Sequence, residues 1–110
     1  MEIVLHTKGH ASIVGLDGRL DANQSKHVTQ KLSEAVDTTS NVIVNLSKVN
    51  FIDSTGLAIL VKGMRNSREK QGDLVLCELQ QPVRIIFELT KLDLAFHIYA
   101  SEQAALEAMQ

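Results

Sequence analysis

The sequence of 110 residues contains no tryptophan, a single cysteine at position 77 and only 4% aromatic residues. One cysteine excludes a disulfide framework and a cluster of thiolate metal ligands. With so few aromatic rings, we do not expect a base-stacking surface that binds single-stranded nucleic acid. The chain also lacks an apolar run close to the roughly 18 residues of a membrane-spanning helix, so we expect no membrane insertion.

The charged residues are nearly balanced, with 11 Lys and Arg against 13 Asp and Glu. Proteins that bind nucleic acid concentrate basic residues on one surface, and a net charge of −2 does not favour such a surface. The first five residues have no basic segment before their apolar stretch, so we do not expect them to form a signal peptide. We therefore expect a cytoplasmic protein without a nucleic-acid partner.

Motifs for catalysis, cofactors and metals are missing as well. A serine-hydrolase elbow needs a glycine two residues before its serine, and Ile52 stands at that position before Ser54. The sequence has no glycine-rich loop of the Walker type, which leaves nucleotide binding without a motif. None of the histidines forms an i, i+4 pair on an expected helix, the arrangement suited to a helix-borne metal site; they are His6, His10, His27 and His97. We expect no enzymatic activity, no cofactor and no metal.

Apolar strand-like runs alternate with helical periodicities along the chain, which is typical of α/β layering. We expect strands at residues 3–5, 11–16, 42–46, 74–77 and 96–99. We expect helices that begin near Asp21, Ser54, Pro82 and Ser101, the first with an apolar face of Ala22, Val28, Leu32, Ala35 and Val36. A turn at residues 9–10 joins the first two strands as a hairpin, so the sheet is mixed, while Asp17 and Gly18 break the strand pattern. No linker or repeat divides the sequence, and we expect one domain over residues 1–110.

The loop between the third expected strand and the following helix is the most informative part of the chain. It contains Asp53, Ser54, Thr55 and Gly56, followed by Leu57. Asp53 or Ser54 is suited to cap the helix, because its side-chain oxygen can accept a free backbone N–H of the first turn. Polar clusters of this kind begin many helices, so capping alone is sufficient to explain the residues.

Ser54 is also suited to carry a reversible phosphate. Phosphorylation adds roughly −1.5 to −2 charges at pH 7, and the positive end of a helix dipole tolerates such a charge. Asp53 already supplies one negative charge beside it. Binding of a partner protein that docks on this loop would therefore be lost through repulsion and desolvation, without unfolding of the domain.

Three parts of the sequence resemble the STAS domain of anti-sigma factor antagonists. Residues 42–46 followed by 51–57 resemble the signature of that family. Residues 18–21 resemble the turn before the family's first helix, and residues 74–77 with the helix at Pro82 resemble its later strand and helix. The resemblance implies an α/β fold, namely a STAS-like single domain with a four- or five-stranded mixed sheet and α-helices packed mainly on one side.

The resemblance also implies partner switching. In this family the unphosphorylated antagonist binds an anti-sigma factor, often a serine kinase, and so frees a sigma factor for transcription. The kinase phosphorylates the antagonist, and a separate serine phosphatase reverses the modification. On this chain the implied phosphorylation site is Ser54, with Thr55 as second choice. The implied partner-binding residues are Asp21, Asp53, Ser54, Thr55, Gly56 and Leu57.

The sequence leaves two alternatives open. Arg19 stands where an acidic residue is common in the family, and this reversed charge either alters partner choice or attracts the phosphate. The alternative function is a constitutive STAS-like structural subunit of a transporter or signalling scaffold. Such a subunit would keep the helix cap of the loop and would need no phosphate.

Overall fold

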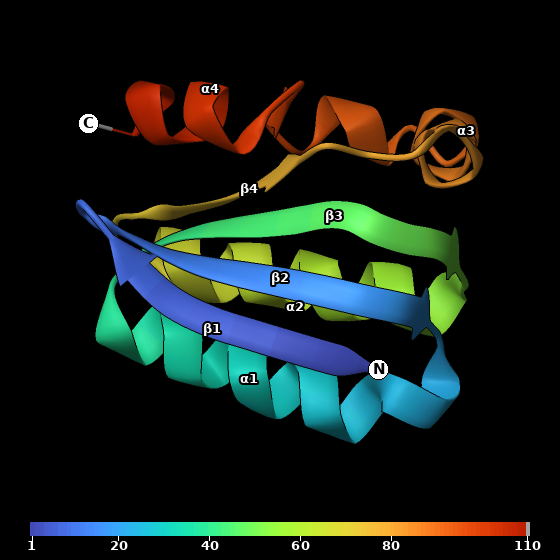
Figure 1. Cartoon of the computed structure of the whole chain (residues 1–110), viewed down its shortest axis with the longest axis horizontal. Coiled ribbons are helices and arrows are strands. Elements are labelled where there is room, and N and C mark those ends of the chain that lie inside the picture. Colours follow the sequence, from blue (N-terminus) through green and yellow to red (C-terminus); the bar gives the residue numbers. More distant parts are fainter. Residues whose placement is uncertain (110) are drawn as a thin grey trace.

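The computed structural model describes residues 1–109 and contains a five-stranded sheet with helices on both of its faces (Figure 1). The strands lie side by side in chain order, with β1 and β2 antiparallel and the other neighbouring strands parallel. They are β1 (Glu2–Lys8), β2 (Ala11–Leu20), β3 (Asn41–Ile52), β4 (Asp73–Cys77) and β5 (Ile98–Tyr99). The expected mixed α/β sheet and its opening hairpin are confirmed.

Within the described residues, four α-helices and two short 3₁₀ helices connect the strands. They are η1 (Ala22–Gln24), α1 (Ser25–Thr38), α2 (Ser54–Glu69), α3 (Gln81–Leu89), η2 (Leu92–Leu94) and α4 (Glu102–Ala108). Two of the expected helix starts are confirmed in detail. The Ser101 hydroxyl accepts the N–H of Ala104 at 3.0 Å at the start of α4, and Pro82 lies in the first turn of α3.

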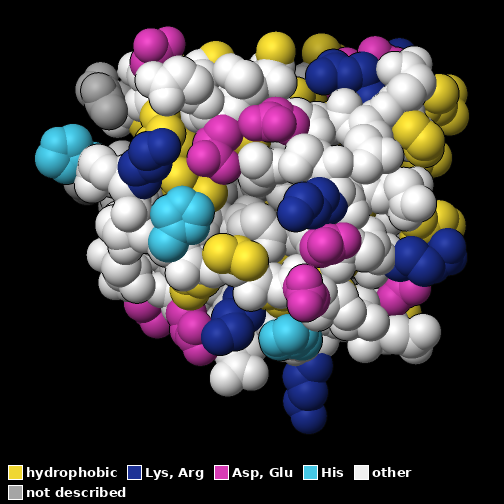
Figure 2. Space-filling view, viewed as in Figure 1, with side chains coloured by type: hydrophobic (Ala, Val, Ile, Leu, Met, Phe, Trp, Pro, Cys, Tyr) yellow, Lys and Arg dark blue, Asp and Glu magenta, His cyan; other side chains and the backbone are white. Residues whose placement is uncertain are grey.

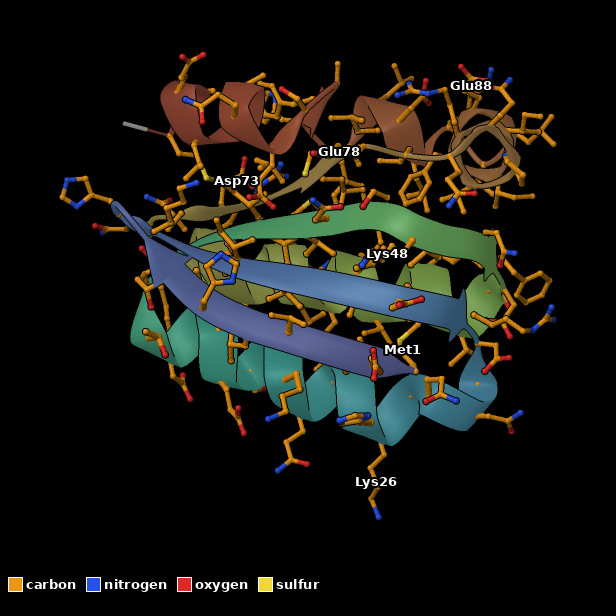
Figure 3. All side chains as sticks on the ribbon, viewed as in Figure 1. Met1, Lys26, Lys48, Asp73, Glu78 and Glu88 are labelled. Carbon is orange, nitrogen blue, oxygen red and sulfur yellow. The ribbon has the colours of Figure 1, made fainter. Side chains whose placement is uncertain are left out.

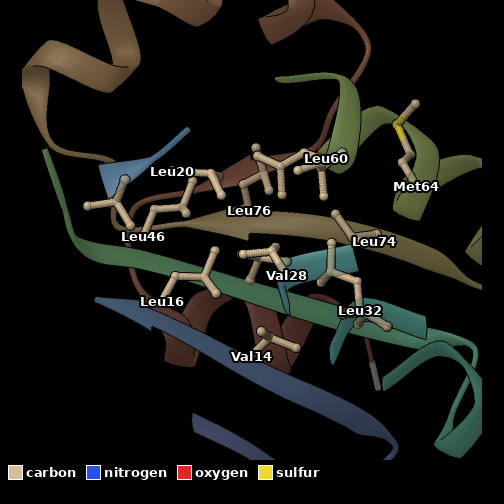
Figure 4. Packing of buried hydrophobic residues seen from close by; sticks show 14 of the residues in the cluster. Val14, Leu16, Leu20, Val28, Leu32, Leu46, Leu60, Met64, Leu74 and Leu76 are labelled. Carbon is tan, nitrogen blue, oxygen red and sulfur yellow. The ribbon is translucent and has the colours of Figure 1, made fainter. Parts of the chain in front are cut away.

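The sheet separates two hydrophobic clusters, because successive residues of a strand point to opposite faces. On one face, strand residues such as Leu76 pack with Leu60 of α2 (Figure 4). Buried residues of α1 and α3 belong to the same cluster. On the other face, Ile43 packs with Leu106 of α4. The helices therefore lie mainly on one side, as expected, and α4 covers part of the opposite face, which we call the outer face (Figure 1).

Cys77 belongs to the smaller cluster, beneath α4, and is fully buried. Burial raises the pKa of its thiol to about 12, and the negative charges of Glu78 and Glu102 add to the rise. The neutral thiol is a poor nucleophile, so Cys77 serves as a small core residue at neutral pH.

β2 and β3 are longer than the sequence indicates. The expectation that Asp17 and Gly18 break the strand is wrong, because β2 continues to Leu20. β3 likewise extends beyond the expected residues 42–46 and ends at Ile52. Two irregularities in the register let the strands stay paired, the second of them at Gly18, whose φ is 126°. Parallel pairing with β3 stabilises the end of β2, and local turn signals carry no information about such a distant partner.

The first helix begins later than expected. The Asp21 carboxylate accepts the N–H of Asn23 at 3.1 Å and caps η1, so that α1 itself begins only at Ser25. Ala22 is exposed, and its assignment to the apolar face is wrong because the 3₁₀ turn shifts it out of phase with α1. The rest of the expected face is confirmed as buried: Val28, Leu32, Ala35 and Val36.

Candidate functional site at the ends of β2 and β3

The extended strands bring two aspartates to one edge of the sheet. β2 and β3 are parallel neighbours with Leu20 opposite Ile52, so Asp21 and Asp53 each follow the end of a neighbouring strand. The Asp53 backbone N–H donates to the Leu20 carbonyl oxygen at 3.3 Å. The loops before η1 and α2 therefore lie side by side, although more than 30 residues separate them in the sequence.

The Asp53 carboxylate joins these two loops. Its Oδ1 accepts the N–H of Gly56 at 2.9 Å, which caps the first turn of α2. Its Oδ2 accepts the N–H of Ala22 at 3.2 Å, in the neighbouring loop. The sequence left the cap open between Asp53 and Ser54, and the structure assigns it to Asp53. One side chain thus satisfies two backbone donors that helix starts leave without partners.

Ser54 is the first residue of α2 and is exposed to solvent, whereas Thr55 is half-buried. Because Asp53 provides the cap, the Ser54 hydroxyl is not needed to hold the helix start. The backbone N–H groups of the first helical turn give this position a positive electrostatic potential. A negatively charged group on Ser54 is compatible with the fold for both reasons.

Gly56 and Leu57 lie beneath this surface. Gly56 is buried, and a Cβ atom at its position would lie 2.4 Å from the Leu20 carbonyl oxygen. Leu57 points into the main core and is 9% exposed. The six residues singled out from the sequence are therefore together at one edge, with Ser54 outermost and these two holding α2 against β2.

Arg19 and Phe51 form a pair that the sequence did not reveal. They lie opposite each other in the parallel register, and the Arg19 guanidinium carbon is 3.8 Å from the centre of the Phe51 ring. Arg19 Nε also lies 3.6 Å from Asp21 Oδ2, and the arginine side chain is 62% exposed. Cation–π contacts and exposed ion pairs of this kind contribute little to stability, but together they hold the guanidinium in one orientation at the surface. No local signal in the sequence indicated the pair, because both residues lie beyond the strand ends expected at residues 16 and 46.

Replacing Asp53 with alanine should lower the free energy of unfolding by about 2–3 kcal/mol, because two backbone N–H groups lose their acceptor. The matched change Asp21→Ala removes the acceptor of one backbone N–H and one exposed ion pair, and should cost only about 1 kcal/mol. Urea unfolding followed by circular dichroism measures both values. Equal losses for the two variants would contradict the joining role of Asp53.

Residues 1–109 contain neither a metal-binding cluster nor a membrane-spanning helix. No group of three or more His, Cys, Asp or Glu side chains in this part of the chain is arranged to hold a metal ion. None of the described helices has the length and apolar character needed to cross a membrane.

Comparison with known proteins gives consistent matches over most of the chain. The STAS domain family profile matches residues 2–105. The anti-sigma F factor antagonist of Paenibacillus polymyxa is 27% identical over 100 residues, which cover 89% of this chain and 86% of the relative. The crystal structure of an anti-sigma factor antagonist from Mycobacterium paratuberculosis superposes with a TM-score of 0.86 at 25% identity, covering 98% of this chain and 92% of that one.

Two further solved structures share the fold at lower identity. The Bacillus cell fate determinant SpoIIAA in its phosphorylated form has a TM-score of 0.77 at 21% identity, covering 99% of this chain and 100% of that one. The murine anion transporter Slc26a9 contains the same fold, with a TM-score of 0.80 at 19% identity, covering 96% of this chain but only 18% of the transporter. The fold therefore occurs both in small regulatory proteins and as one part of a transporter.

Proposed function

This chain belongs to the STAS domain family, and we propose that it is an anti-sigma factor antagonist whose binding is switched off by phosphorylation of Ser54. The observation that carries the proposal is the position of Ser54: it is exposed, it begins α2, and the cap beside it is made by Asp53. The relative from Paenibacillus polymyxa and the structure from Mycobacterium paratuberculosis are both named anti-sigma factor antagonists, which supports the same function.

Phosphorylation at this position preserves the fold. The hydrogen bonds at the start of α2 come from the Asp53 carboxylate and from the Asp53 carbonyl oxygen, which accepts the Leu57 N–H at 3.0 Å. None of them uses the Ser54 hydroxyl, so a phosphate there breaks no cap. The N-terminal end of α2 also offsets part of the charge of roughly −1.5 to −2 that the phosphate adds.

The same phosphate changes the surface at the ends of β2 and β3. Before modification, the carboxylates of Asp21 and Asp53 both accept backbone N–H groups, and Arg19 stands beside them as an exposed cation. A phosphate on Ser54 places a bulky dianion next to Asp53. A partner that fits the unmodified edge then meets like charge and must strip water from the phosphate, which removes its binding.

The proposed partners are those that the resemblance to anti-sigma factor antagonists implies. The unphosphorylated chain binds an anti-sigma factor, in this family often a serine kinase, and so frees a sigma factor for transcription in the cytoplasm of a bacterium. The kinase modifies Ser54 and a serine phosphatase restores it. The chain takes no catalytic part in these steps. One of the structures that share the fold is described as a phosphorylated form, which supports a switch of this kind.

Mass spectrometry of the protein isolated from its native cells tests the proposal. Cleavage after Lys48 and Lys62 gives a peptide in which Ser54 and Thr55 are the only hydroxyl-bearing residues. We expect one phosphate on this peptide, with fragment ions that place it on Ser54 and a fraction that changes with growth condition. A phosphate on Thr55 instead moves the site by one residue. If the peptide carries no phosphate under any condition, the proposal is contradicted.

A constitutive subunit of a transporter or scaffold is the second candidate function. It is favoured by the shared fold of the anion transporter and by the Asp53 cap, which explains the loop without any phosphate. Under this alternative, Ser54→Ala and Ser54→Asp bind the partner equally well, whereas the switch predicts opposite results for the two variants.

A further inference from the structure

A groove of about 220 Å³ crosses the outer face of the sheet, beside α4 and over β1, β2 and β3. This outer groove has Val4, Ile13 and Gly15 among its floor residues. α4 packs on the adjoining part of the same face, where Leu106 shares a hydrophobic cluster with Ile13. Beyond α4 the floor is open, and Val4 is 60% exposed. One half of this face is therefore covered by a helix and the other half is not.

Gly15 gives the outer groove its depth. A Cβ atom at this position would lie no closer than 3.9 Å to Val4 Cβ and to the Val4 carbonyl oxygen, which is ordinary contact. Its φ also lies outside the left-handed region that favours glycine. A larger residue is sterically allowed at position 15, so the glycine leaves space that an apolar side chain from another molecule can fill.

Acidic side chains predominate on the rim of the outer groove. Glu2, Asp17 and Glu102 line it, together with Lys48 and His6. Figure 3 places Lys48 over the middle of the sheet, and Figure 2, in the same view, shows acidic side chains beside a basic one there. The ion pairs formed within residues 1–109 all lie elsewhere, so the carboxylates of Glu2 and Asp17 are available to cations from outside.

We propose that the outer groove docks a basic amphipathic helix of a partner protein. The apolar face of this helix lies on Val4 and over Gly15, beside α4, and completes the half-covered layer. Its Lys and Arg side chains pair with the carboxylates of the rim, which provide the charge complementarity. A small molecule fits less well, because ligand pockets usually enclose about 300–1,000 Å³ and this groove is smaller and open to solvent.

The outer groove is separate from the edge that carries Ser54. Ser54 begins α2, which packs on the other face of the sheet (Figure 1). The groove lies over the strands on the outer face. A phosphate on Ser54 leaves the shape and the charges of the groove unchanged. The groove partner therefore stays bound in both states of the proposed switch, and its docking does not depend on that switch.

Nuclear magnetic resonance titration of the full chain tests this proposal. The probe is an amphipathic helical peptide of about 18 residues built from Leu and Lys, and the same pattern of Leu and Glu is the control peptide. We expect the Leu/Lys peptide to shift the backbone amide signals of β1, β2 and the start of α4, and the Leu/Glu peptide to leave them in place. Gly15→Val, which fills the floor, should weaken binding at least about tenfold.

Charge variants provide the matched comparison. Glu2→Lys with Asp17→Lys should also weaken binding about tenfold, because the rim then repels the Lys side chains. Glu69→Lys with Glu88→Lys makes the same change in net charge away from the groove and should alter binding less than about twofold. Amide spectra and urea unfolding verify that each variant is folded. If Gly15→Val does not fold, the smaller change Gly15→Ala is used in its place.

Several results would overturn the proposal. The two peptides bind equally well, or the Leu/Lys peptide shifts amide signals over the whole surface of the protein. Folded Gly15→Val binds the Leu/Lys peptide with wild-type affinity, or both pairs of charge variants lose the same affinity for it. Shifts of the groove signals with protein concentration, in the absence of peptide, would show that a second copy of the chain occupies the groove instead.

Discussion

Replacing Ser54 with aspartate should weaken binding of the chain to the proposed anti-sigma factor partner by about 2–3 kcal/mol, or roughly 30- to 150-fold. The new carboxylate stands beside Asp53 on the outermost residue of the edge, where a docked partner cannot avoid it. Fold stability should change by less than about 0.5 kcal/mol, because the cap is made by Asp53 and an acidic residue is favourable in the first turn of a helix. Isothermal titration calorimetry and urea unfolding measure the two quantities.

Two variants complete this experiment. Ser54→Ala should bind as the unmodified protein does and should stay bound after incubation with kinase and ATP. Ser33→Asp makes the same chemical change at an exposed position in α1, away from the edge, and should leave affinity unchanged. If Ser54→Asp binds as tightly as Ser54→Ala, repulsion at the edge is not the mechanism.

Replacing Gly56 with alanine should destabilise the protein by about 3 kcal/mol or more. Its Cβ would lie 2.4 Å from the Leu20 carbonyl oxygen and 2.9 Å from Ile52 Cγ1. The backbone oxygen belongs to the paired end of β2 and cannot move aside, so the start of α2 must shift away from the sheet. That shift also separates Asp53 from Ala22 and breaks the hydrogen bond between the two loops.

Gly63→Ala is the matched control for this change. Gly63 is also buried in α2, but the atoms nearest to its Cβ are the ends of two side chains, Leu74 Cδ1 at 2.9 Å and Leu32 Cδ1 at 3.4 Å. These side chains can adjust, and alanine gains about 1 kcal/mol in helix propensity over glycine. We expect a net change within about 1.5 kcal/mol, measured by the same urea unfolding. A loss as large in Gly63→Ala as in Gly56→Ala would show that the helix tolerates no added volume anywhere, and the specific role of the Leu20 contact would be wrong.

The sequence predicted those elements whose signals are local. Ser101 indicated the start of α4 through its cap, Pro82 indicated the start of α3, and the apolar run at residues 42–46 indicated a buried strand. The order of elements and the family signature were sufficient for the mixed sheet with helices mainly on one side. Each of these signals depends on residues within about one turn or one strand of each other.

Features that depend on distant partners were missed. β2 continues past Gly18 because β3 pairs with it, and Asp53 reaches Ala22 across a separation of 31 residues. The pairing of Arg19 with Phe51 requires the register of two strands, which no local pattern gives. The outer groove depends on where α4 ends on the sheet. The candidate residues themselves were found because their types and order, unlike their contacts, can be recognised in a linear sequence.

The place of Ser54 inside the first turn of α2 bears on how an enzyme can reach it. Hydrogen bonds from Gly56 and Leu57 to Asp53 hold the backbone on both sides of the hydroxyl in a bent, helical path. Presenting Ser54 in an extended conformation requires local unfolding of α2, at a free-energy cost that only a small fraction of molecules meets at any moment. Under the proposed switch, a kinase that binds the helical turn of Ser54 as it stands avoids this cost, and it would modify folded chains in preference to unfolded ones.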